Sequence, residues 1–176
     1  IIFIFSRSGC DRAMNEILHS NLRLNNETEI DKIRDIVEEA TKQIPNSDLS
    51  LLGFYEWQEG LERGVAVHHA GLLPIFKETV EKLFQLGLIK VVFATETLAL
   101  GINMPAKSVY LEKLSKFNGQ GHVPITPGEF TQLTGRAGRR GIDIEGHSVV
   151  QWYPEIDTSY VASLAATRTY PLRSSF

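Results

Sequence analysis

The stretch that decides the fold is the apolar run Leu88-Ile-Lys-Val-Val-Phe-Ala94, which is followed at once by Thr95-Glu-Thr97. A short run rich in β-branched residues is typical of a strand that is buried on both faces of a parallel sheet. Polar residues directly after such a strand lie at its carboxyl end, where open α/β sheets bind their ligands. The run therefore predicts a central strand with a candidate binding segment at its end.

The rest of the chain alternates in the same way. Short apolar runs predict further strands at residues 1–5, 65–68, 109–111 and 147–152, and apolar residues at helical spacing predict helices at 10–20, 30–44, 49–63 and 74–86. Thr126, Pro127 and Glu129 form a capping box with proline at the first helical position, which predicts a helix from there to Arg136. This alternation indicates a three-layer α/β/α fold with a mainly parallel sheet.

Length and composition exclude several classes of protein. The 176 residues suit one domain, and the single cysteine, Cys10, excludes a disulfide framework and a cysteine-built zinc site. Cys10 is interpreted as structural, because no histidine or asparagine pattern supports a nucleophile. The apolar start at 1–5 lacks the basic flank and cleavage site of a signal peptide, so we expect a cytoplasmic protein whose first strand follows earlier chain.

The charge is unevenly distributed. The whole chain carries a formal charge of −3, which by itself argues against a nucleic-acid binder. Residues 21–64 carry −5, whereas the remainder carries +2. The acidic segment therefore masks a faintly basic remainder, and it is interpreted either as a solvated helical lid or as a docking surface for a basic partner.

The strongest motif is the segment 132–141, which reads Gln-Leu-Thr-Gly-Arg-Ala-Gly-Arg-Arg-Gly. While the helix persists, Gln132, Arg136, Arg139 and Arg140 share one face. Crowded guanidinium groups repel one another unless an anion lies among them, and the planar arginine fork pairs two phosphate oxygens at once. The segment therefore predicts a phosphate site, and its glycine spacing matches neither a Walker A loop nor a dinucleotide fingerprint.

Three other segments follow predicted strands. They are 95–105 with its two threonines, 6–9 (Ser-Arg-Ser-Gly) and 68–72 (His-His-Ala-Gly-Leu). Each alone is a weak signal, and a capped turn is the better interpretation of the segment 95–105 taken by itself. Together, at one edge of a sheet, they predict a ligand-lined surface. A metal shared by the adjacent histidines His68 and His69 is not expected, because no third ligand is suitably spaced.

These segments together resemble the second RecA-like domain of a superfamily 2 DExH-box RNA helicase of the superkiller type, and several resemble actinobacterial members. Residues 3–11 resemble motif IV, 67–72 the following signature loop, 95–105 motif V, 132–141 motif VI, and 171–176 the segment leading into a winged-helix domain. The resemblance implies a RecA-like domain at 1–160 with a helical insertion at about 21–64, and a connection at 161–176.

The resemblance also implies roles for the matching residues. Arg136 and Arg139 would be arginine fingers that reach ATP, with Mg²⁺, bound mainly by the first RecA-like domain of the same chain. Gln132 would lie near the γ-phosphate and the attacking water. Gly101 and Asn103 would contact the nucleotide, although related families often carry aspartate at the position of Asn103.

A second set of residues would hold single-stranded nucleic acid by its backbone. They are Ser6, Arg7, Gly71, Thr95 and Thr97. The partner expected for them is single-stranded RNA, with DNA possible, and RNA-degradation factors are further possible partners. No membrane partner is expected.

The sequence has neither a Gly-Lys-Ser/Thr loop nor an Asp-Glu pair that would hold Mg²⁺. We therefore expect this chain alone to be inactive and to supply half of an ATPase site. Two alternatives stay open at this point. One is a DNA helicase of the related repair branch, and the other is a non-catalytic platform that binds protein or RNA.

Overall fold

The computed structural model describes residues 1–99 and 103–167. Gly101 and the segment 171–176, both named above, lie outside the described residues. The chain forms two compact units, Ile1–Leu98 (unit 1) and the part from Ala99 onward (unit 2), and each is described by itself. No helix in the described ranges is both long and apolar enough to cross a membrane.

Unit 1 is built on three parallel strands in the order β2-β3-β1: β1 (Ile2–Phe3), β2 (Val65–His68) and β3 (Val91–Ala94). The central strand, β3, pairs with β1 so that Phe3 is opposite Ala94, and with β2 so that His68 is opposite Ala94. All four residues of β2 are buried, as expected for a parallel strand that is covered on both faces. The three carboxyl ends therefore lie at one edge.

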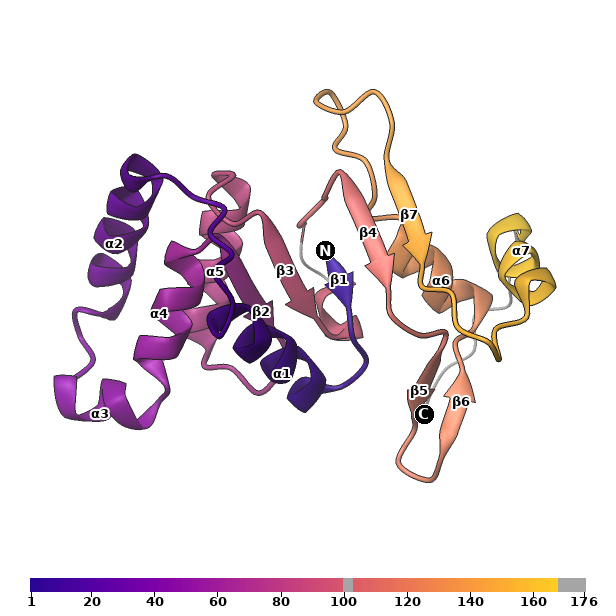
Figure 1. Cartoon of the computed structure of the whole chain (residues 1–176), viewed down its shortest axis with the longest axis horizontal. Coiled ribbons are helices and arrows are strands. Elements are labelled where there is room, and N and C mark those ends of the chain that lie inside the picture. The colour runs from indigo at the N-terminus through magenta and orange to yellow at the C-terminus, as the bar shows by residue number, and fades with distance from the viewer. Residues whose placement is uncertain (100–102, 168–176) are drawn as a thin grey trace. The chain divides into compact units, whose positions relative to one another are not determined.

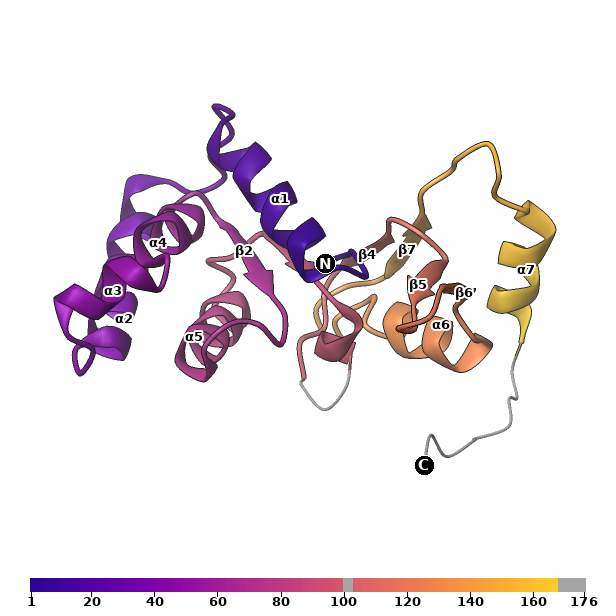
Figure 2. The same cartoon turned by 90° about the horizontal axis from the view of Figure 1, so that it is seen from below.

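Helices cover both faces of these strands. α1 (Arg7–Leu18) and α5 (Pro74–Gln85) lie on opposite sides of β2 (Figure 2). α1 contributes Cys10 and Met14 to a core cluster that includes Val65, Val67 and Phe93. The Sγ of Cys10 is buried and donates to the carbonyl oxygen of Ile4 at 3.5 Å, which supports its interpretation as structural.

The acidic segment folds into three helices, α2 (Glu27–Thr41), α3 (Asn46–Leu51) and α4 (Phe54–Glu62), shown in indigo to purple in Figure 1. α2 begins with a capping box made by Asn26 and Glu29, and it packs against α4 and α5. The single helix predicted at 49–63 is wrong, because the chain turns at Gly53, whose φ of +67° favours glycine and ends α3. The ring of Trp57 on α4 stacks on Phe76 of α5 at 4.2 Å.

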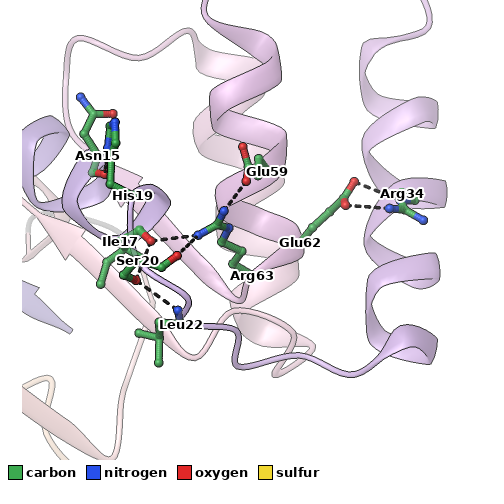
Figure 3. Close-up of polar contacts among 9 residues, drawn as sticks. All are labelled: Asn15, Ile17, His19, Ser20, Leu22, Arg34, Glu59, Glu62 and Arg63. Carbon is green, nitrogen blue, oxygen red and sulfur yellow. Dashed lines mark hydrogen bonds and ion pairs between the residues drawn. The ribbon is translucent and has the colours of Figure 1, made fainter.

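Arg63, directly after α4, ties that helix to the end of α1 (Figure 3). Its Nη1 donates to the carbonyl oxygens of Ile17 and Ser20, both at 2.9 Å, and its Nη2 pairs with Glu59. The side chain is only 8% exposed, and the carboxylate and the two carbonyl oxygens offset the cost of burying its charge. A second arginine, Arg34 of α2, reaches Glu62 of α4 at 2.8 Å but is 53% exposed.

Unit 2 has two parallel strands, β4 (Ser108–Leu111) and β7 (His147–Val150), and an antiparallel hairpin of β5 (Ser115–Phe117) and β6 (His122–Pro124). α6 (Pro127–Thr134) begins with the predicted capping box of Thr126 and Glu129 and packs against α7 (Thr158–Ala166). The hydroxyl of Tyr160 on α7 donates to the carbonyl oxygen of Ile125 at 2.7 Å. Figure 1 shows β4 and β7 side by side.

Several predicted boundaries were wrong. α1 begins at Arg7 and not at Cys10, because the Ser6 side chain accepts from the Gly9 amide and caps the helix. β1, β3 and β7 are shorter than their apolar runs, since only part of each run pairs. The hairpin β5–β6 and the helix α7 had not been predicted.

We predict that Arg63→Ala lowers the free energy of unfolding of unit 1 by about 2–4 kcal/mol, because two helix-end carbonyls and Glu59 lose a buried partner. Urea denaturation followed by Trp57 fluorescence measures this, with exposed Trp152 replaced by phenylalanine in every protein. Arg34→Ala is the matched control and should change the midpoint far less, because the Arg34 side chain is 53% exposed. Equal effects of the two variants would contradict the assignment.

Candidate functional site

The carboxyl edge of the unit 1 strands gathers three of the predicted segments. Ser6 and Arg7 follow β1, His69 to Gly71 follow β2, and Thr95 to Thr97 follow β3, and the register ends all three strands at one level. This is the edge at which open α/β sheets bind ligands. The residues brought together here are five of the predicted site residues, namely Ser6, Arg7, Gly71, Thr95 and Thr97.

Arg7 and Gly71 lie next to each other at this edge. A Cβ built on Gly71 would meet the Arg7 side chain at 3.4 Å and the His69 ring at 3.1 Å. A side chain at position 71 would therefore crowd this part of the edge. Glycine keeps the loop backbone accessible beside an exposed cation, which suits contact with a phosphate backbone.

His69 fixes the geometry of that loop. Its Nδ1 accepts from the Gly71 amide at 3.1 Å, so the proton of the neutral ring is on Nε2, which donates to the Asp11 carboxylate of α1 at 2.9 Å. The ring is buried. His68 points elsewhere, to Glu81 of α5 at 2.9 Å, so the two histidines serve different contacts.

The hydroxyls at this edge are linked to each other. The Thr95 and Thr97 oxygens lie 2.9 Å apart, and the short 3₁₀ helix η1 (Glu96–Ala99) begins between them. Thr95 is buried, whereas Thr97 is exposed. The Ser6 oxygen already accepts from the Gly9 amide, so its first function is to cap α1. Ser6, Arg7 and Thr97 are exposed, and of these Thr97 and Arg7 have no part in a helix cap made by their side chains.

In unit 2, α6 leads into the arginine segment. Exposed Gln132 is on α6, which ends at Thr134, but further turn-type backbone bonds carry the chain to Ala137. Arg136 lies one turn beyond Gln132, and its Nη2 donates to the carbonyl oxygen of Ala99. Within unit 2, Arg136 thereby connects the segment that resembles motif VI with Ala99 of the segment that resembles motif V.

The helix that would place Gln132, Arg136, Arg139 and Arg140 on one face ends at Thr134, so all three arginines lie beyond it. Beyond α6, Ala137 makes a bridge to Ala106, after which Gly138 takes a φ of +90° and turns the chain before Arg139. The backbone then doubles back so closely that a Cβ on Gly146 would lie 2.4 Å from the Gly138 nitrogen. Arg139 and Arg140 are therefore presented by a loop, and Arg140 is exposed.

Asp143 is the anion that the sequence interpretation lacked among these arginines. Its Oδ2 accepts from the Arg139 backbone amide at 2.9 Å and from Nε at 2.8 Å, while its Oδ1 accepts from Nη2 at 2.8 Å. These bonds to Arg139 lower the pKa of Asp143 to about 2 and raise the pKa of Arg139. The two residues are four positions apart, but they pair in a loop, where helical charge spacing gives no signal.

The structure says little about Gly101 and Asn103, the two residues predicted to contact the nucleotide. Asn103 is exposed, and Gly101 lies outside the described residues. In the described ranges, no three His, Cys, Asp or Glu side chains lie close enough together to hold a metal ion.

The hairpin β5–β6 carries an aromatic pair that sequence reasoning missed. Phe117 is 59% exposed and makes an edge contact with the ring of His122 at 5.7 Å. Lys116 pairs with Glu129 and so ties the hairpin to the first turn of α6. An exposed ring on an anchored hairpin suits stacking against a nucleic-acid base.

Residues 13–141 match the family described as helicase conserved C-terminal domain, which is well over half of the chain. The chain belongs to the helicase C-terminal domain family. This match, with parallel strands and flanking helices in the structure, confirms the RecA-like α/β fold predicted from the sequence.

The relatives place the chain within the Ski2-like group. It is 63% identical over 176 residues to the probable helicase HelY of Mycobacterium tuberculosis, covering 100% of this chain and 19% of that protein. It is 41% identical over 153 residues to the antiviral helicase SKI2 of Saccharomyces cerevisiae, covering 87% and 12%. It is 39% identical over 176 residues to the ATP-dependent RNA helicase mtr4 of Schizosaccharomyces pombe, covering 100% and 16%. The chain thus spans about a fifth or less of these relatives.

We predict that Gly146→Ala opens the loop that presents Arg139, because its methyl group would overlap the backbone of Ala137 and Gly138. The expected cost is about 1–3 kcal/mol of stability, with a shift of the Arg139 amide resonance in ¹H–¹⁵N spectra. Gly121→Ala is the matched control, since a Cβ there meets nothing within 4 Å. A Gly146→Ala protein as stable as this control, with an unmoved resonance, would refute the close approach.

Proposed function

We propose that this chain is the C-terminal motor domain of an ATP-dependent RNA helicase. Family membership supports the helicase part, and similarity to RNA helicases such as mtr4 supports RNA as the substrate. The observation that carries the proposal is the loop-borne guanidinium of Arg139. Its side chain is 40% exposed while its inner edge is held by Asp143, which leaves an edge directed to an external anion.

The proposed chemistry is stabilisation of the phosphoryl group that leaves ATP. ATP would be bound mainly by the first RecA-like domain, and Arg139 and Arg136 would approach its phosphates from this domain. Arginine supplied across a cleft stabilises the charge that spreads over the transferring group. Gln132, one turn before Arg136, would orient the attacking water, and Gly101 and Asn103 would contact the nucleotide.

In this proposal Mg²⁺ is bound by the other domain and not by the residues of this chain. The ion prefers carboxylate and water oxygens, whereas this side of the proposed site supplies arginines. When bound with ATP, the ion would neutralise charge on the β- and γ-phosphates, and we assign its protein ligands to the first RecA-like domain. The residues of this chain would bind and orient the phosphate oxygens, and they would supply no ligand to the metal ion.

The nucleic-acid strand would be held at the carboxyl edge of unit 1. Arg7 would pair with phosphate, the backbone beside Gly71 would approach the strand closely, and the Thr97 hydroxyl would donate to a phosphate oxygen. Ser6 and Thr95 would support these contacts through the helix cap and the threonine pair. Because such contacts recognise the backbone and not the bases, they suit a motor that moves along any sequence.

We predict that Arg139→Ala in the full-length protein removes most RNA-stimulated ATP hydrolysis, by roughly 10³-fold or more, as for arginine fingers in other phosphoryl-transfer enzymes. ATP binding, measured with a fluorescent analogue, should stay near the wild-type value, because most of the nucleotide contacts belong to the other domain. Arg140→Ala is the neighbouring control. Near-normal turnover of the Arg139→Ala protein would exclude this role, and the 176-residue chain alone should show no turnover.

RNA and DNA substrates distinguish the proposal from its alternatives. The full-length protein should unwind an RNA duplex with a 3′ overhang when ATP is added, and it should unwind the matched DNA duplex much more slowly. Equal or greater activity on DNA would favour a helicase of the repair branch. Binding of RNA without ATP-dependent unwinding would favour the non-catalytic platform.

A further inference from the structure

We propose that Asp143 is a positioning residue, which holds the Arg139 guanidinium from one side so that its opposite edge is presented to a phosphate. This inference rests on the proposed function, since it assigns the residue that prepares Arg139 for the transferring phosphoryl group. The family match ends at residue 141, so Asp143 lies just outside it.

The first argument is the choice of edge. A guanidinium offers two bidentate edges, one made by Nε with one terminal nitrogen and one made by the two terminal nitrogens. Asp143 binds Nε and Nη2 of Arg139, each at 2.8 Å, and thus uses the side edge. In the described part of the structure no hydrogen bond to Nη1 is found, so the end edge is the one available to a bidentate oxyanion.

The second argument is the difference in burial within the pair. The Asp143 side chain is 6% exposed, whereas that of Arg139 is 40% exposed. The carboxylate therefore lies beneath the arginine, and the guanidinium is the outward member. A carboxylate that masked the arginine would lie on its solvent side, which is the reverse of this arrangement.

The third argument is that the loop buries a charged side chain and exposes the apolar side chains next to it. The residues on either side of Asp143, Ile142 and Ile144, are 71% and 102% exposed. A loop selected only for stability would bury the isoleucines and expose the aspartate, because apolar burial is favourable and burial of a charge is costly. Here the loop directs the Asp143 carboxylate inward to Arg139, while Glu145 and both isoleucines are exposed.

The backbone enforces this geometry. The amides of Ile142 and Asp143 both donate to the Arg139 carbonyl oxygen, at 3.0 and 2.9 Å, while the Arg139 amide donates back to Asp143. The Gly138–Gly146 contact closes the loop outside this turn. A long arginine side chain that would otherwise sample many rotamers is thus ordered before substrate arrives, which is the condition for electrostatic preorganisation.

The test uses the full-length helicase and RNA-stimulated ATP turnover. Asp143→Asn keeps the shape of the side chain but replaces one acceptor by an amide group, and it should lower kcat at least tenfold with KM for ATP changed less than twofold. Asp143→Glu keeps the charge but displaces the guanidinium by about one bond length, and it should also lower kcat. Asp157→Asn is the control, since that carboxylate only caps α7.

Double substitution separates positioning from a general effect on folding. In an Arg139→Ala background, Asp143→Asn should cause no further loss of turnover, because the group it positions is gone. A further loss of similar size would overturn the inference, and so would wild-type or raised kcat in both Asp143 variants. Should Asp143→Asn fail to fold, Asp143→Glu decides by the same criteria. If Arg139→Ala itself turns over normally, the proposed function fails; if only the Asp143 variants do, this inference alone fails.

Discussion

The parallel pairing of β3 with both β1 and β2 is the constraint on which unit 1 depends. It places the end of β1, the end of β2 and the end of β3 at one level, so that Arg7, Gly71 and Thr97 come to the same edge although they are far apart in sequence. Each strand is short, and the pairing is stable because helices bury both faces. The register of the three strands thus determines which residues form the proposed nucleic-acid binding surface.

Much of this could be predicted from the sequence, because parallel strands leave strong local signals. A strand does precede Thr95, although it takes only Val91–Ala94 of the apolar run, and the predicted capping box at Thr126 forms. The helix boundary at Gly53 was missed, because apolar spacing continues through a residue whose φ only the folded chain determines. Likewise, the apolar residues of β7 did not show that it has only four residues, since pairing with β4 decides its length.

The candidate site was predicted by residue type but not by geometry. Arg139 was identified from the glycine and arginine spacing, whereas the turn at Gly138 that places it on a loop was not. Asp143 was missed because a single acidic residue beyond a basic motif is ordinary in sequence, and only the fold brings it under a guanidinium. Long-range contacts such as Asp11 with His69 have no local signal at all.

The strand order of unit 1 also has a consequence for how the chain is made. β1 pairs with β3 alone among the unit 1 strands, and Ile2 is opposite Phe93. Such distant pairing is slow to form, since the chain between the two strands must lose conformational entropy before their contacts stabilise it. During synthesis the apolar residues of β1 therefore leave the ribosome before their partner strand β3 has been made.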